Sequence, residues 1–138
     1  MKQFLKYIYL CLMGGFLYVL IEILWRGHTH WTMGVVGGVA FVIVGLINEI
    51  LSWKIPLYLQ GLIGSLIITS IEFISGCILN LWLKMNIWDY SSVCPNIMGQ
   101  VCLQYSILWF VLSILCIVTD DYIRYWFFNE EKPRYRFI

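Results

Sequence analysis

The chain has 138 residues, of which 61% are hydrophobic, 17% aromatic and only 12% charged. A soluble domain carries about 25% charged residues, so this composition excludes an ordinary water-soluble fold and indicates an integral membrane protein. The formal net charge is +1 and the basic residues are not clustered, which argues against a nucleic-acid-binding surface.

Four continuous apolar runs follow one another along the chain, each close to the length of about 20 residues that a membrane-spanning helix needs. They cover residues 4–25, 33–51, 57–83 and 101–119. The first run is too long for the core of a signal peptide, and strands of a β-barrel would alternate in polarity. We therefore predict an all-α integral membrane protein, a single domain over residues 1–138 built as a bundle of four transmembrane helices.

The distribution of Lys and Arg predicts how this bundle sits in the membrane, because short loops rich in these residues face the cytoplasm. Arg26 and Lys84 lie on one side. The other seven of the nine lie at the N-terminus, in the second loop or near the C-terminus: Lys2, Lys6, Lys54, Arg124, Lys132, Arg134 and Arg136. We expect both termini in the cytoplasm, with Asp120 and Asp121 beside Arg124 marking the cytoplasmic boundary of the last span. The last helix is expected to continue past Asp120.

Three glutamates, Glu22, Glu49 and Glu72, lie within the first three apolar runs. An ionised side chain near the bilayer centre costs roughly 2.5–3.5 kcal/mol, so each carboxylate should face protein or water. Glu49, nearest the cytoplasmic end, is expected to meet water or Lys54. In the third run, small and polar residues recur along one side of a helix: Gly61, Ser65, Thr69, Glu72, Gly76 and Asn80. This side is predicted to face the bundle interior, since small residues let another helix approach closely.

Two interpretations of the polar residues remain open. In the structural one, they pair within or between helices, for example Glu22 with Arg26 one turn later, or Glu72 with Asn80 or a neighbouring helix. In the functional one, they form an outward-facing polar pocket for a solute or ion, built from Glu22, Glu72, Asn80 and Asp89.

The segment between the third and fourth runs is long for a connection within a helix bundle. Asp89 and Ser91 can bond their own backbone, and Pro95-Asn96 is typical of a turn or a helix start. We expect an ordered outer loop whose motif residues are Trp88, Asp89, Tyr90, Ser91, Pro95, Asn96 and Gly99. Cys94 and Cys102 flank its turn, and whether they form a disulfide stays open.

Other candidate sites are incomplete. His28 and His30 supply two of the three or four ligands that zinc takes, so we expect no metal site. Ser91, with Asp89 and His30, supplies the residue types of a nucleophile and a base but not their arrangement, so we expect no enzymatic activity. The chain has no GxxxxGK[ST] nucleotide-binding motif, and no cofactor is predicted.

Much of the chain, from about residue 22 to residue 109, resembles a family of small bacterial membrane proteins, named Putative ABC-transporter type IV. The segments that carry the resemblance are His30-Trp31-Thr32-Met33, Glu72-Phe73-Ile74-Ser75-Gly76, Leu79-Asn80, Ile87-Trp88-Asp89-Tyr90-Ser91, Pro95-Asn96, Gly99-Gln100-Val101-Cys102-Leu103 and Ser106-Ile107-Leu108-Trp109. The resemblance implies a protein of the bacterial cytoplasmic membrane and an ABC-type permease. An ATP-binding subunit would then be a separate polypeptide.

Two functional hypotheses follow. The first is a small permease or transport-related subunit in the lipid bilayer with the outward-facing polar pocket described above. The alternative is a non-transporting interaction or assembly protein that binds a partner or lipid through its outer loop. If the protein transports a solute by itself, we expect a homodimer or larger assembly, because four helices leave little room to enclose a transport pathway. Most assemblies of identical chains are two-fold symmetric.

Overall fold

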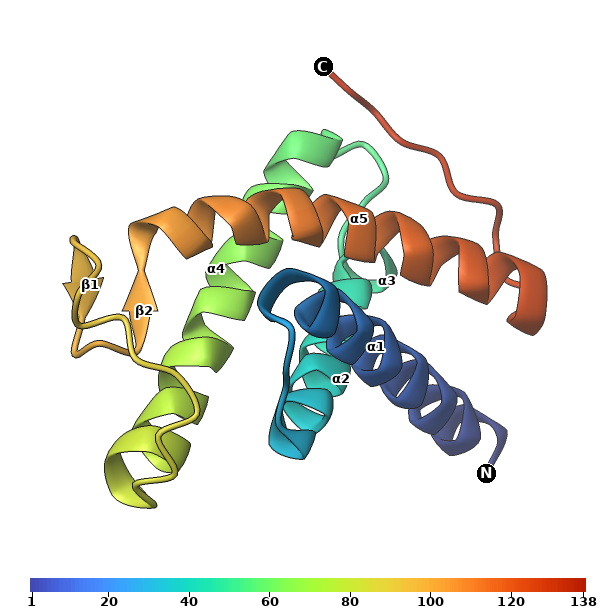
Figure 1. Ribbon diagram of the computed structural model, residues 1–138. Coiled ribbons are helices and arrows are strands. Elements are labelled where there is room, and N and C mark those ends of the chain that lie inside the picture. Colours follow the sequence, from blue (N-terminus) through green and yellow to red (C-terminus); the bar gives the residue numbers. More distant parts are fainter.

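The computed structural model describes all 138 residues and contains four helices long and apolar enough to cross a membrane (Figure 1). In chain order, the helices are α1 (Lys2–Arg26), α2 (Trp31–Gly45) with its extension α3 (Ile47–Ile50), α4 (Leu57–Gly76) with its π-helical extension η1 (Cys77–Trp82), and α5 (Leu103–Phe128). Two short antiparallel strands, β1 (Asn96–Ile97) and β2 (Val101–Cys102), precede α5. The predicted bundle of four membrane-spanning helices is confirmed.

The helices form two closely packed pairs (Figure 1). Helix α1 runs along α2, α4 packs against α5, and α2 also contacts both α4 and α5. Glycines allow the close approach: a Cβ on Gly15 would lie 2.5 Å from the carbonyl oxygen of Gly34, and one on Gly61 would lie 2.7 Å from the side chain of Ile114. Small residues at helix contacts are typical of membrane proteins, where van der Waals packing drives association.

The small and polar side of α4 faces α5 and the loop that precedes it. The Ser65 hydroxyl donates to the Ser106 carbonyl oxygen at 2.7 Å, and the Thr69 and Ser106 hydroxyls lie 2.9 Å apart. A Cβ on Gly76 would lie 2.6 Å from Oε1 of Gln100. The interface thus keeps the polar groups of α4 away from lipid, as its sequence periodicity predicts.

The last helix continues past Asp120, as expected, because α5 runs to Phe128. The carboxylates of Asp120 and Asp121 are both buried inside the bundle. Asp120 accepts a bond from Nε of Arg124 at 2.7 Å, and Asp121 accepts one from the Asn48 amide at 2.7 Å. With these partners on α5 and α3, the carboxylates need no contact with water, and the helix does not end there.

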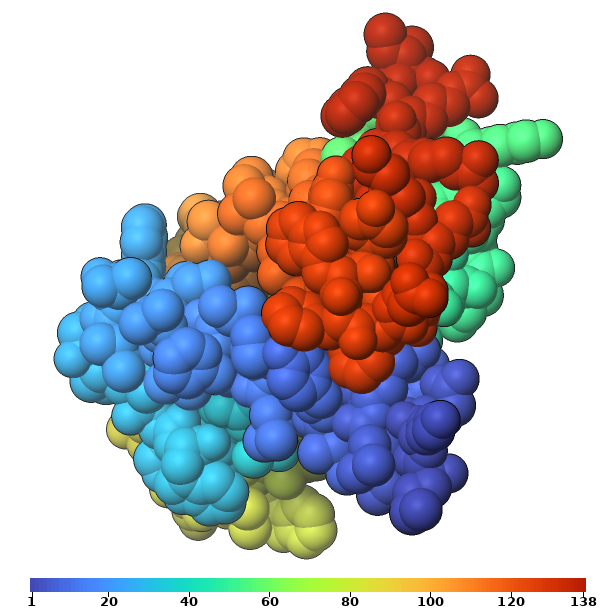
Figure 2. Space-filling view, turned by 90° about the vertical axis from the view of Figure 1, so that its right-hand side faces the viewer, coloured from blue at the N-terminus to red at the C-terminus, as the bar shows by residue number.

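The two ends of the chain lie on the same side of the bundle. Lys6 donates to Glu130 at 2.5 Å, and the carbonyl oxygen of Arg136 accepts a bond from the Leu57 amide at 2.7 Å. In Figure 2 the C-terminal tail, in red, lies beside the green segment that leads into α4. We call this the termini side. The opposite side, formed by residues 27–30 and 83–102, is the loop side.

Candidate functional site

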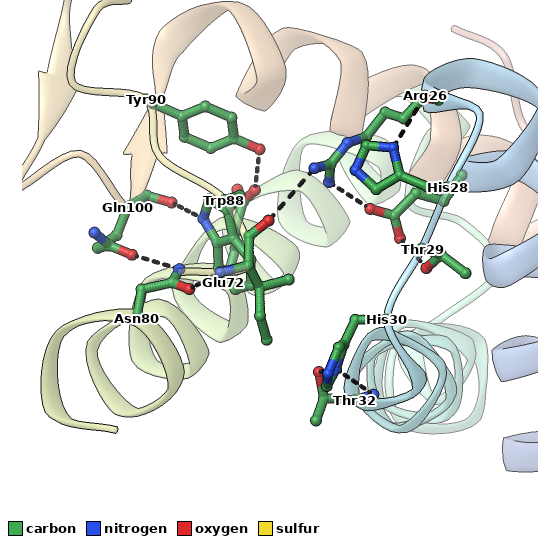
Figure 3. A network of polar contacts seen from close by, with 12 residues as sticks. Arg26, His28, Thr29, His30, Thr32, Glu72, Asn80, Trp88, Tyr90 and Gln100 are labelled. Atoms are coloured by element: carbon green, nitrogen blue, oxygen red, sulfur yellow. Dashed lines mark hydrogen bonds and ion pairs between the residues drawn. The ribbon is translucent and has the colours of Figure 1, made fainter. Parts of the chain in front are cut away.

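Segment 83–102 folds back over α4 and η1 and is held there by side-chain hydrogen bonds (Figure 3). Asn80, on η1, accepts a bond from the Ile87 amide at 2.7 Å and donates to Oε1 of Gln100 at 2.9 Å. The indole of Trp88 donates to the carbonyl oxygen of Gln100 at 3.0 Å, and both residues are buried. Asn80 therefore joins the end of the third span to the loop.

Asp89 stabilises a turn of this loop. Its Oδ1 accepts a bond from the Ser91 amide at 2.9 Å and a second bond from the Ser91 hydroxyl. These bonds favour the ionised carboxylate and hold the pKa of Asp89 below its ordinary value. Gly99, at φ 71°, packs against the same groups, and a Cβ there would lie 2.7 Å from the Ser91 hydroxyl. Asp89 itself is exposed.

Glu22, near the loop-side end of α1, is 5% exposed and has a partner on each carboxylate oxygen. Arg26 donates to Oε1 at 2.6 Å, and Thr29 donates to Oε2 at 3.0 Å. Arg26 also reaches the carbonyl oxygen of Ile87 at 3.4 Å, which ties α1 to the loop (Figure 3). For Glu22, the structure shows the intrahelical pairing of the structural interpretation.

Glu72, on α4, is 8% exposed and is bonded differently. The Tyr90 hydroxyl donates to its Oε1 at 2.9 Å, and the Trp109 indole donates to its Oε2 at 2.9 Å. Neither donor carries a charge, and none of the ion pairs in the structure includes Glu72. Burial and the Glu72 charge raise the pKa of Tyr90 above its ordinary value, so its hydroxyl stays a donor.

Glu72 also lines a cavity of about 340 Å³ where the α1–α2 and α4–α5 pairs meet. All four spanning helices contribute to its wall, and 14 of the 18 lining residues are hydrophobic. Glu72 is the only acidic or basic residue among them; the aromatic side chains include Tyr18, Phe41, Trp88 and Trp109. This volume lies within the usual range of small-molecule sites, which are mostly apolar with few polar groups.

The structure does not bring the four predicted pocket residues together around this cavity. Only Glu72 lines it. Glu22 and Asn80 belong to the hydrogen-bond network of the loop side, and Asp89 caps an exposed turn. The cavity is therefore mostly apolar, with one carboxylate in its wall, and is not lined by the predicted cluster of polar groups.

A second polar cluster lies on the termini side. Arg124 is 1% exposed, bonds Asp120, and lies 3.8 Å from both Glu49 and Glu130. Glu49 was expected to meet water or Lys54; its side chain is 37% exposed, and its charged neighbour is Arg124 rather than Lys54. The Tyr135 hydroxyl donates to Asp121 at 2.9 Å, and burial together with the charge of Asp121 raises the pKa of Tyr135. These contacts fasten the C-terminal tail to α5.

The histidines and the loop cysteines have local roles. His30 is the N-cap of α2: its Nδ1 accepts a bond from the Thr32 amide at 3.3 Å. Nδ1 of His28 lies 3.2 Å from the carbonyl oxygen of Arg26. Cys94 and Cys102 are free thiols, the first exposed and the second buried at the start of α5.

Comparison with known proteins identifies the family of the chain. A family model described as Putative ABC-transporter type IV matches residues 7–136. The chain belongs to this family. The match includes all four spans and the loop, and confirms the resemblance seen in the sequence motifs. No curated protein and no solved structure matches the chain.

As a member of the ABC-transporter type IV family, the chain is a small multi-pass membrane protein related to ABC transporters. The predicted pocket lacked the two residues that bind Glu72: Tyr90, which was expected only as a residue of the outer-loop motif, and Trp109. The position of Trp109 in the sequence does point to a buried polar partner, because it lies well inside an apolar run, whereas the other tryptophans lie near run ends. A tryptophan buried in a span needs a partner for its N–H group, and here that partner is Glu72.

Proposed function

We propose that this protein is a transport-related subunit of an ABC-type system and that it binds a small solute in the cavity between its helix pairs. Glu72 would be the main polar contact of that solute. The observation that carries the proposal is a buried carboxylate lining an apolar cavity to which all four spanning helices contribute. Ionisable residues inside spans are costly, and they commonly mark the path of a solute or ion.

The position of the cavity also supports a transport role. Close glycine contacts hold α1 to α2 and α4 to α5, and a further one joins Gly45 of α2 to the Asp120 side chain of α5; the cavity lies between the two pairs. In many transporters the substrate site lies between bundles that rock against each other. A movement of one pair relative to the other would alter access to this cavity and leave the tight contacts within each pair intact.

The orientation we propose places the termini side in the cytoplasm of a bacterial cell, because that side carries most of the Lys and Arg residues. The loop side would then face outward. Glu72 is bonded to Tyr90 of the loop segment, so the carboxylate would lie nearer the outer face. A separate ATP-binding subunit would act on the termini side, since the chain has no nucleotide-binding motif of its own.

The test compares cells in which the chromosomal gene is wild type, deleted, or replaced by one of three variant genes. The variant proteins are first shown to be present at equal levels in the membrane. Ala40→Phe fills the cavity from α2, Glu72→Ala removes the carboxylate, and Glu131→Gln changes an exposed tail glutamate as the matched control. Untargeted mass spectrometry measures small solutes inside and outside the cells. We expect deletion, Ala40→Phe and Glu72→Ala to shift the same solutes, and Glu131→Gln to match wild type.

Two outcomes would contradict the proposal. A wild-type solute profile in Ala40→Phe cells, beside an altered profile in deleted cells, would show that the cavity is not the solute site. An unaltered profile in deleted cells would refute transport, and would favour an assembly role for the loop side.

A further inference from the structure

We infer that the cavity takes a hydrophobic organic cation, namely a quaternary ammonium group on a small aromatic or aliphatic body. The inference rests on the proposed function, because it names the class of solute for the same cavity. Three features of the wall carry it: the unbalanced carboxylate, the aromatic rings, and the absence of other charged groups.

The charge balance around Glu72 differs from that of Glu22 and Asp120, and among the buried carboxylates only Asp121, beside Arg124 on the termini side, likewise has neutral donors alone. Glu22 and Asp120 each have a guanidinium partner, at 2.6 Å and 2.7 Å, whereas Glu72 has only two neutral donors. A carboxylate has about four lone-pair positions, so two bonds leave acceptor capacity. A charge in a low-dielectric site is stabilised by an opposite charge. A cation in the cavity would supply the partner that no residue of the chain provides.

The aromatic part of the wall suits a cation that lacks N–H groups. Tyr18, Trp88 and Trp109 line the cavity, and the ring centroids of Tyr18 and Trp109 are 6.3 Å apart. The indole N–H groups of both tryptophans are already bonded, so these side chains have only π surface left to offer. Aromatic rings attract cations most strongly where water is excluded, and they bind quaternary ammonium groups in this way.

The same wall disfavours other classes of solute. No Lys, Arg or His lines the cavity, so an anion would meet only the Glu72 carboxylate. No group of three His, Cys, Asp or Glu residues exists that could hold a metal ion. A primary ammonium would lose its hydration and find few acceptors among the 14 hydrophobic residues of the wall. A quaternary ammonium has no N–H groups, so it loses no N–H hydrogen bonds to water when it enters the cavity.

The experiment uses two probes of the same shape that differ in charge, phenyltrimethylammonium and tert-butylbenzene. Their binding to the full-length protein in lipid nanodiscs is measured by calorimetry, with empty nanodiscs subtracted. We expect Glu72→Gln to weaken binding of the cation by about tenfold or more, which corresponds to about 1.4 kcal/mol. Glutamine retains the size of Glu72; its carbonyl oxygen can accept from the Trp109 indole and its amide can donate to the Tyr90 hydroxyl, so binding of tert-butylbenzene should stay within about twofold.

Two further variants keep the test decisive if Glu72→Gln folds poorly. Tyr18→Leu removes one ring and should weaken only the cation, by about threefold. Glu131→Gln, in the exposed tail, should bind both probes like wild type. Failure of the cation to bind wild type, or equal loss of both probes in Glu72→Gln and Tyr18→Leu, would overturn the cation inference. The proposed function is judged separately, by the solute profile of Ala40→Phe cells.

Discussion

Replacing Arg124 with Met tests how far the buried charges of the termini side depend on one another. The Arg124 side chain is 1% exposed and bonds Asp120, which is 0% exposed, at 2.7 Å. Methionine fills much of the same space without the charge, so Asp120 would stay buried without a cation. Removing one partner of a buried ion pair costs about 3–5 kcal/mol. The matched control is Arg134→Met, which breaks an exposed pair with Glu131 worth at most about 1 kcal/mol.

The assay is reversible unfolding of the purified protein in mild detergent by added SDS, followed by circular dichroism. We expect Arg124→Met to lower the free energy of unfolding by about 3–5 kcal/mol. The double variant Asp120→Asn with Arg124→Met should be more stable than the sum of the single effects, by about 2 kcal/mol. A loss for Arg124→Met no larger than that for Arg134→Met would refute the argument.

The remaining predictions concern packing, pH, assembly and topology. Gly76→Ala should lower the free energy of unfolding by about 1–3 kcal/mol in the same assay, because its Cβ would lie 2.6 Å from Oε1 of Gln100. The raised pKa of Tyr135 means that only the unfolded state loses this proton as the pH rises above about 10. Stability should therefore fall above that pH, and less steeply in Tyr135→Phe. If the protein transports a solute by itself, native mass spectrometry in mild detergent should show a homodimer or larger assembly; monomer alone would exclude a self-sufficient pore. Reporters fused after Ile138 and inside segment 84–100 should report cytoplasm and exterior respectively, and the reverse pattern would refute the proposed orientation.

The four spans and the interior side of α4 are predictable from sequence because the information is local. A run of apolar residues is enough to identify a span, and a spacing of three and four is enough to identify a side of a helix. The pairing of Glu22 with Arg26 is local as well, since the two residues lie one turn apart. The same spacing joins Asp120 to Arg124, in the part of α5 that was expected to continue past Asp120.

The contacts of Glu72 are not local, and this is why the candidate site was predicted only in part. Its two donors lie 18 and 37 residues away, one in the loop and one on α5. Sequence periodicity gives the side of each helix but not which helices meet. It therefore could not show that Asn80 bonds the loop, while Glu72 lines a cavity shared by all four spans.

Occupancy of the cavity is observed most directly by fluorine NMR of the protein labelled with 5-fluorotryptophan in nanodiscs. Trp88 and Trp109 line the cavity, whereas Trp25, Trp31 and Trp126 are exposed on the outside of the bundle. Single Trp→Phe variants assign the resonances. We predict that phenyltrimethylammonium shifts the Trp88 and Trp109 resonances in wild type and leaves the exposed tryptophans unchanged. Shifts confined to the exposed tryptophans, with Trp109 unmoved at saturating probe, would contradict a solute site beside Glu72.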